Sequence, residues 1–186
     1  MESRPAFQES FSTASPMRFL VLLVVSLLAA FSVRAAEPFT NFNVVLLQSS
    51  SVLEERVVSV DEMADYIKAI EAASRQAVAA SPARQAVGGY LVVAVRPGQQ
   101  SRVWLDFDAL LDLEIRKQLI AAARAVKPFE ARKGPVVFAL KVAIWGGKET
   151  RRPAPLPPEW KRAQQSGGPL EVGELVEAVW DQAAAP

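Results

Sequence analysis

Four carboxylates form the densest group of oxygen ligands in the sequence: Asp106, Asp108, Asp112 and Glu114. Calcium and manganese ions bind such groups in proteins. A calcium-binding loop also needs a glycine near its middle, where this run has Leu110 and Leu111. The run leads from an expected strand into an expected helix, where carboxylates cap the helix and interact favourably with its dipole. We therefore interpret the carboxylates as structural, and we predict no metal, no cofactor and no catalytic residue.

The residue types that are missing exclude most familiar catalytic chemistry. The chain has 186 residues, of which 51% are hydrophobic, and it contains neither Cys nor His. It therefore cannot use a thiolate nucleophile, a Ser-His pair, a disulfide or the common zinc ligands. The formal net charge of +1 lacks the basic excess of a nucleic-acid-binding protein, so no nucleic-acid partner is expected. The pairs Gly88-Gly89 and Gly146-Gly147 lack the spacing of a phosphate-binding loop.

Aromatic residues offer a different kind of site, namely a surface for a protein partner. Exposed aromatic side chains often mark recognition surfaces. The residues predicted to bind a partner lie on the outward faces of two expected strands and in the C-terminal tail: Trp104, Val137, Lys141, Trp145, Trp160 and Trp180. The interpretation that we favour is that the tail folds back and covers these strand faces with its own aromatic residues, and a groove for a partner is the alternative.

Two helices are expected to position these residues. Residues 60–80 carry apolar side chains at helical spacing, and the preceding Ser59 with Glu62 has the spacing of a capping box. Asp112 is placed to cap a second helix, which covers residues 112–127 and ends before Pro128. Both segments therefore predict amphipathic helices with one apolar face.

The expected strands lie around these helices. Residues 89–107 predict a β-hairpin, because Pro97-Gly98 separates two runs that are rich in β-branched and aromatic residues. Residues 135–145 predict a long strand, because the alternate positions from Val136 are all large and apolar. The leading segment 36–58 contains an apolar run that permits one short strand.

The elements together predict an α+β fold. We expect a small antiparallel sheet packed by two helices, in the order helix, hairpin, helix, strand, within a domain covering residues 59–147. The remaining residues, 148–186, form a Pro-rich C-terminal tail. Its prolines cluster in residues 153–158, which predicts an extended segment, and a short helix is expected beyond it.

The first 35 residues have the layout of an N-terminal extension with a signal peptide. Residues 19–31 are an apolar run that is shorter than a membrane-spanning helix, and small residues follow it. We expect cleavage after Ala35, which would leave no stable membrane span. This pattern predicts a periplasmic or secreted protein.

Three short sequences in this element order resemble the C-terminal domain of the TonB/TolA family of envelope proteins. They are residues 89–95 (GYLVVAV) before a Pro-Gly turn, residues 125–129 (AVKPF) at the end of a helix, and residues 134–135 (GP) before the last strand. The resemblance implies a Gram-negative envelope protein that binds a partner, often by pairing an extended peptide with the sheet edge.

The sequence thus favours a non-enzymatic, exported module that binds another envelope protein or an extended peptide. We expect the strand 135–145 and the tail to form or cover the recognition edge. An open edge strand also permits a homodimer. Two alternatives remain: an exported hydrolase that uses the carboxylates with a metal, and a protein that inhibits one enzyme or toxin in the manner of an immunity protein.

Overall fold

The computed structural model describes residues 36–167 and 171–181. The chain divides into two units, residues 1–35 and 36–186, and the described residues all belong to the second. The predicted signal peptide, with its apolar run 19–31, therefore lies outside the described residues. Within the part that is described, no helix is both long and apolar enough to cross a membrane.

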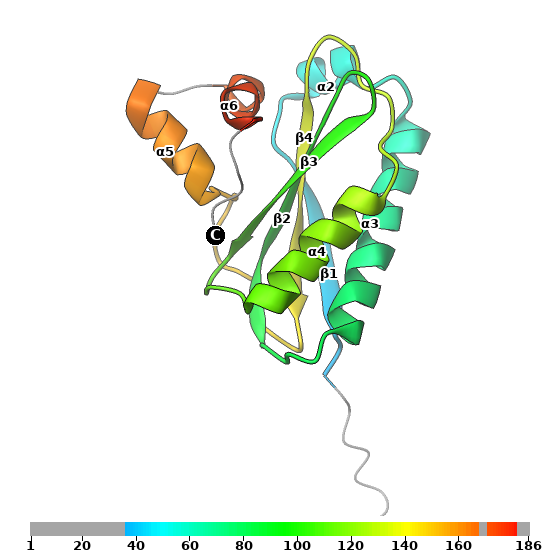
Figure 1. The fold of residues 1–186 in the computed structure, drawn as a ribbon. Coiled ribbons are helices and arrows are strands. Elements are labelled where there is room, and N and C mark those ends of the chain that lie inside the picture. Colours follow the sequence, from blue (N-terminus) through cyan, green and yellow to red (C-terminus); the bar gives the residue numbers. More distant parts are fainter. Residues whose placement is uncertain (1–35, 168–170, 182–186) are drawn as a thin grey trace, which may run out of the picture. The chain divides into compact units, whose positions relative to one another are not determined.

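A four-stranded antiparallel sheet is the centre of the described unit (Figure 1). Its strands are β1 (Phe39–Leu46), β2 (Val87–Arg96), β3 (Gln100–Phe107) and β4 (Val136–Ile144), in the spatial order β1-β4-β2-β3. Five helices occur in the described residues: α2 (Ser50–Arg56), α3 (Val60–Ala80), α4 (Leu113–Ala125), α5 (Pro158–Gly167) and α6 (Val172–Val179). The predicted α+β class with a small antiparallel sheet is confirmed.

The two long helices begin at the caps that the sequence indicates. The Ser59 side chain accepts a hydrogen bond from the Glu62 amide at 3.2 Å and caps α3. The Asp112 carboxylate accepts from the Glu114 amide at 2.9 Å and caps α4. These bonds satisfy amides that the first helical turn leaves without partners. Asp112, one of the four carboxylates that were considered as metal ligands, therefore has a structural role.

The α3–α4 core lies between these helices and one face of the sheet. Every second side chain of β4 enters it, because side chains alternate across a strand. On β3, the same alternation places Val103, Leu105 and Phe107 against this core. The hairpin turn between β2 and β3 uses two residues with positive φ, Gly98 at 81° and Gln99 at 53°.

The strand β4 is a central strand and not an edge. It pairs with β1 on one side and with β2 on the other. The prediction that strand 135–145 forms the recognition edge is therefore wrong, because β1 from the leading segment covers the side that was expected to be open. Since β1 belongs to the same sheet, the sheet also begins before residue 59. The two edges of the sheet are β1 and β3.

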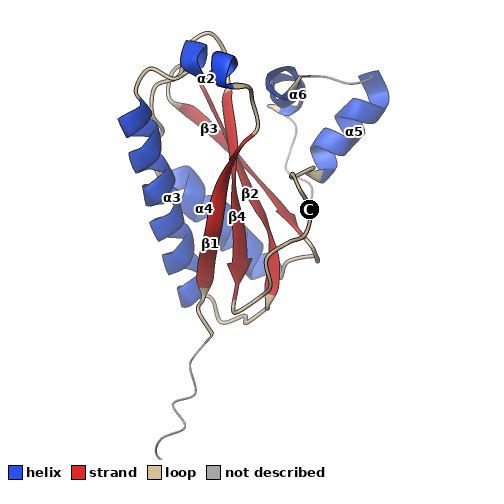
Figure 2. Ribbon diagram, turned by 180° about the vertical axis from the view of Figure 1, so that it is seen from behind, coloured by secondary structure: helices blue, strands red, loops and turns tan. Residues whose placement is uncertain are grey.

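The second face of the sheet is covered by α5 and α6 (Figure 2). The tail core is formed by side chains of β2, β3 and β4 together with Trp160 of α5 and Leu175, Val176, Val179 and Trp180 from α6 and its end. The sheet therefore lies between two helical layers. The tail holds two helices beyond its proline segment, and the second layer explains why the strands β2 and β4 are buried on both faces.

Candidate functional site

The strand β3 pairs with β2 on one side, and on its other side no strand of the described chain adds to the sheet. A cavity of about 250 Å³ lies along this free side. We call it the β3 groove. Its lining consists of residues 103–107 of β3, residues 109–111, Arg116 and Ile120 of α4, and Pro158 and Glu159 of α5.

The hydrogen-bond pattern of the hairpin decides which backbone groups of β3 point into the groove. The Asp108 amide donates to the Gly88 carbonyl at 2.9 Å, so Asp108 is directed toward β2. In an antiparallel pair this orientation alternates from residue to residue. The backbone groups of Val103, Leu105 and Phe107 are therefore directed away from β2, toward the groove.

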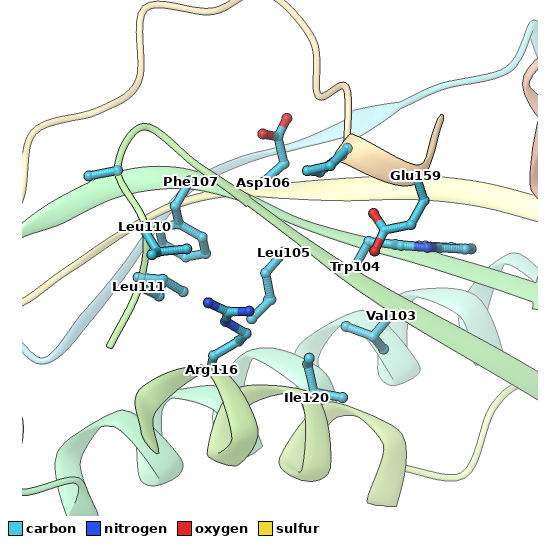
Figure 3. A pocket seen from close by; sticks show the side chains of 12 residues that line it. Val103, Trp104, Leu105, Asp106, Phe107, Leu110, Leu111, Arg116, Ile120 and Glu159 are labelled. Carbon is cyan, nitrogen blue, oxygen red and sulfur yellow. The ribbon is translucent and has the colours of Figure 1, made fainter. Parts of the chain in front are cut away.

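Figure 3 shows the groove walls and the charged side chains that reach into it. Leu105, Leu110 and Leu111 form an apolar wall, and Leu110 is 79% exposed. Arg116 extends from α4 toward β3, while Glu159 approaches from α5 on the opposite side. The groove thus combines an open strand edge and an apolar surface with one basic residue, Arg116, and two acidic residues, Asp106 and Glu159.

Basic and acidic residues lie close together around Arg102 of β3. Burial lowers the pKa of Arg102, and the neighbouring Arg124 guanidinium lowers it further. Glu159 and Asp181 act on this pKa in the opposite direction. Desolvation and the Arg124 charge thus both disfavour the charged form of Arg102, and the two carboxylates partly compensate.

Asp106 and Asp108 hold the segment that follows the sheet, which we call the strap (residues 148–157). Arg152 donates through Nη1 to the Asp106 carboxylate at 2.6 Å and through Nε to the Asp108 carboxylate at 3.0 Å. Burial alone would lower the pKa of Arg152, but the two carboxylates raise it above its ordinary value. The amide of Leu156 also donates to the Asp106 carboxylate, at 2.7 Å.

The carboxylates of the sequence motif therefore have separate structural partners. Asp106 and Asp108 bind the strap, while Asp112 caps α4. Among residues 36–167 and 171–181, no three acidic side chains converge in a way that could hold a metal ion.

Glycines allow the strap to pass close to the sheet. A Cβ atom at Gly88 would lie 2.0 Å from the Lys148 carbonyl oxygen, and one at Gly147 would lie 2.4 Å from the Val87 amide nitrogen. Neither distance is compatible with a side chain. Gly88 and Gly147, one residue from each glycine pair at a strand boundary, thus have a second role, which is to let the start of the strap lie close to β2.

Four of the six residues predicted to bind a partner lie together in the tail core. Trp104, Val137, Trp160 and Trp180 are all buried, and the rings of Trp104 and Trp160 pack edge to face. Trp104 lies on the face of β3 that points away from the α3–α4 core, as predicted. That face is buried, because α5 and α6 cover it. This arrangement is the one described above as the tail folding back onto the strands.

The other two predicted residues lie elsewhere. Lys141 is on the same face of β4 as Val137, but its ammonium group pairs with Glu149 at 2.6 Å, and this bond raises the pKa of Lys141. Trp145 does not continue the outward face of β4. It has a positive φ of 49°, packs against the α3–α4 core, and lies beneath the Arg84 guanidinium. The structure therefore does not bring the six residues into one surface.

Sequence reasoning missed most of the groove. Its apolar wall comes from a loop, a strand edge and one side of α4, and these parts are adjacent only after the chain folds. One available signal was the pair Leu110-Leu111, two large apolar residues that lie between β3 and α4 and belong to neither element.

No match is found in any of three comparisons, whether with protein-family models, with curated proteins or with solved structures.

Proposed function

We propose that this chain is a non-enzymatic, exported protein of the bacterial envelope that binds an extended segment of another envelope protein. The binding site is the β3 groove. The observation that carries the proposal is the free edge of β3, whose outward backbone groups at Val103, Leu105 and Phe107 face a cavity of about 250 Å³.

Strand addition supplies the physical basis for this function. An unpaired strand edge offers its amides and carbonyls to any extended peptide, and the main-chain hydrogen bonds supply affinity. Pockets beside the edge then select side chains. In the β3 groove, the apolar wall at Leu110 and Leu111 would accept an apolar residue.

The proposed export is compatible with how the sheet begins. The Pro38 carbonyl accepts from the Trp145 amide at 3.1 Å, and the Glu37 carbonyl accepts from the Gly146 amide at 3.2 Å. Cleavage after Ala35 would leave both bonds and all of β1 in place. The protein would then act in the periplasm or as a secreted protein, without a membrane span.

We also propose the TonB/TolA-like arrangement for the central part of the unit. The succession α3, β2, β3, α4, β4 supports it, since a helix, a hairpin, a second helix and a strand follow one another. Two additions distinguish this chain: β1, which occupies the outer side of β4, and the tail helices α5 and α6. The additions leave β3 as the edge at which a peptide can bind.

The test is photo-crosslinking in cells from the groove of the full-length protein. A photoreactive amino acid at position 110 should capture one discrete envelope protein. The same amino acid at position 68, on the exposed side of α3, is the control and should not capture that protein. Mass spectrometry of the adduct should place the crosslink in an extended segment of the partner.

Two proline variants test whether the partner pairs with the backbone of β3. Proline removes an amide donor, and it is tolerated in sheets mainly on edge strands. Leu105→Pro removes an outward amide inside the groove and should abolish the crosslink from position 110. Ser101→Pro removes an outward amide of the same strand outside the groove lining and should preserve it. Circular dichroism checks that both variants fold.

Equal capture from positions 110 and 68, or a crosslink that survives Leu105→Pro in a folded protein, would contradict the proposal. Capture of an enzyme whose activity is lost on binding would instead support an inhibitor.

A further inference from the structure

The second edge of the sheet, β1, carries large apolar side chains that nothing in the described chain covers. Phe42 is 41% exposed, Val44 is 37% exposed and Leu46 is 52% exposed. Val44 and Leu46 lie opposite Leu140 and Phe138 of β4, so they are on the α3 side of the sheet. They extend the apolar surface of that face beyond the last strand.

The backbone of β1 is also available for pairing at this edge. The Leu47 amide donates to the Val137 carbonyl at 3.2 Å, so Leu47 is directed toward β4. By alternation, the backbone groups of Val44 and Leu46 are directed away from β4. Val44 and Leu46 thus combine an exposed apolar side chain with backbone groups that are directed away from the sheet.

This edge lacks the charged side chains that usually protect an edge strand. Charged side chains on edge strands normally prevent pairing with other chains. No charged residue occurs from Pro38 to Leu53, a stretch that includes all of β1. The other edge strand, β3, carries Arg102 and Asp106.

We propose that the free edge of β1 is the interface of a symmetric homodimer. In this dimer β1 pairs antiparallel with β1 of a second copy, about a two-fold axis that passes beside Val44. This surface is separate from the β3 groove, so the proposal does not depend on the proposed function.

A second copy suits this edge because β1 is complementary to itself. A two-fold axis at Val44 places Val44 opposite Val44, and Phe42 opposite Leu46 of the other copy. Val44 then meets Val44, and Leu46 lies across from Phe42, the residue at which the register of β1 on β4 shifts. The uncharged strand brings no like charges of its own together, whereas a partner with a charged strand would lose hydration without gaining an ion pair.

The geometry of β1 favours a closed dimer over an open fibre. The register of β1 on β4 shifts between Asn41 and Asn43, which marks a bulge. A bulge bends the strand and limits pairing to a short stretch. A two-fold contact uses the same surface on both copies, so it occupies the edge completely and leaves nothing for a third chain.

Cysteine crosslinking tests the register directly, because the chain has no Cys of its own. Residues that face each other across an antiparallel pair are close enough for a disulfide. The full-length Val44→Cys variant, oxidised in cells, should therefore run as a covalent dimer on a non-reducing gel. Leu110→Cys is the matched control, since Leu110 is 79% exposed but lies at the other edge, and it should stay monomeric on the gel.

A mixed experiment tests the predicted offset. Differently tagged Phe42→Cys and Leu46→Cys chains, expressed together, should crosslink to each other in preference to their own kind. Crosslinking without this preference, or equal crosslinking of Val44→Cys and Leu110→Cys, would overturn the proposal. An adduct of Val44→Cys with a different protein would also overturn it.

Added charge provides a second measurement that needs no crosslink. In sedimentation, the unaltered full-length chain should have twice the mass of one chain. Combining Val44→Lys with Leu46→Lys should halve that mass, while Leu110→Lys should leave it unchanged. Both altered residues are partly exposed, so circular dichroism should stay unchanged. A monomeric unaltered chain, or a folded double variant that keeps the doubled mass, would contradict the dimer.

Discussion

The indole of Trp160 on α5 meets the indole of Trp104 on β3 edge to face, with centroids 5.4 Å apart and ring planes at 72°. This contact joins the C-terminal tail to the sheet. It explains how a chain without disulfides holds a second helical layer, because aromatic pairs of this geometry add to the free energy of burial. It also places the start of α5 at one end of the β3 groove, where Pro158 and Glu159 line the cavity.

The first prediction concerns Trp160, which is 2% exposed. Trp160→Ala should lower the free energy of unfolding by about 3–5 kcal/mol, because it removes a large buried side chain and leaves a cavity. Leu156→Ala is the control. Leu156 is exposed, so its replacement should change the free energy of unfolding by less than about 0.5 kcal/mol. Urea denaturation measures both changes. Equal effects would mean that the tail core does not stabilise the protein.

The second prediction concerns the attachment of the strap by Arg152. Arg152→Met should cost about 1–2 kcal/mol, because Asp106 would be left largely buried without its cation, although the exposure of Arg152 weakens the pair. Arg151→Met, at the exposed neighbouring position, should cost less than about 0.5 kcal/mol. Adding Asp106→Asn to Arg152→Met should recover part of the loss. If the double variant instead loses the sum of the free energies of unfolding that the two single variants lose, then Arg152 and Asp106 act independently.

The third prediction concerns the close approach at Gly88. Gly88→Ala should destabilise the protein by more than about 2 kcal/mol, because the new methyl group would collide with the Lys148 backbone. Gly167 on α5 is the matched control, since nothing lies within 4 Å of an added Cβ there. Gly167→Ala should change the stability by less than about 1 kcal/mol. Thermal unfolding compares the two variants, and similar melting temperatures would contradict the proposed path of the strap.

The fourth prediction concerns Tyr66, a buried residue of α3. Burial raises the pKa of Tyr66, while the Ser101 hydroxyl acts in the opposite direction. A raised pKa means that the folded state keeps the phenol protonated when the unfolded chain loses that proton. The corresponding stability is fully present below the unfolded pKa of about 10 and is lost as the pH rises through the folded value.

Tyr66→Phe should therefore show a smaller loss of stability than the unaltered protein when the pH rises from about 9 to about 11. The ring packs edge to face on Phe129 and Phe138, and phenylalanine keeps these contacts. Near pH 7 the substitution should change the free energy of unfolding by less than about 1 kcal/mol. Denaturation at a series of pH values measures the difference. Parallel alkaline losses in both proteins would contradict the role of Tyr66.

The helices and the hairpin could be predicted because their signals are local. Ser59 and Asp112 are found at the caps where they were expected, and Pro97-Gly98 lies in the turn between β2 and β3. Each of these signals depends on residues within a few positions along the chain. The alternating pattern of residues 136–144 likewise indicates a strand and its larger apolar face.

The partners of each strand could not be predicted in the same way. The apolar pattern of β4 is compatible with an edge or a central position, and its central position depends on β1, which is far away in the sequence. The same reason applies to the surroundings of Trp104. The alternation correctly places it opposite the α3–α4 core, but only the folded chain brings α5 to that face.

The sequence by itself determined where helices begin, where the hairpin turns, which side chains share a face, and that thiol and imidazole chemistry is absent. Only the tertiary structure decided that β1 and β3 are the edges, that Arg152 binds Asp106, and that the groove lies between α4 and α5. The physical reason is the range of the interactions. Caps and turns depend on neighbours in the chain, whereas strand pairing and buried contacts join distant segments and depend on the whole fold.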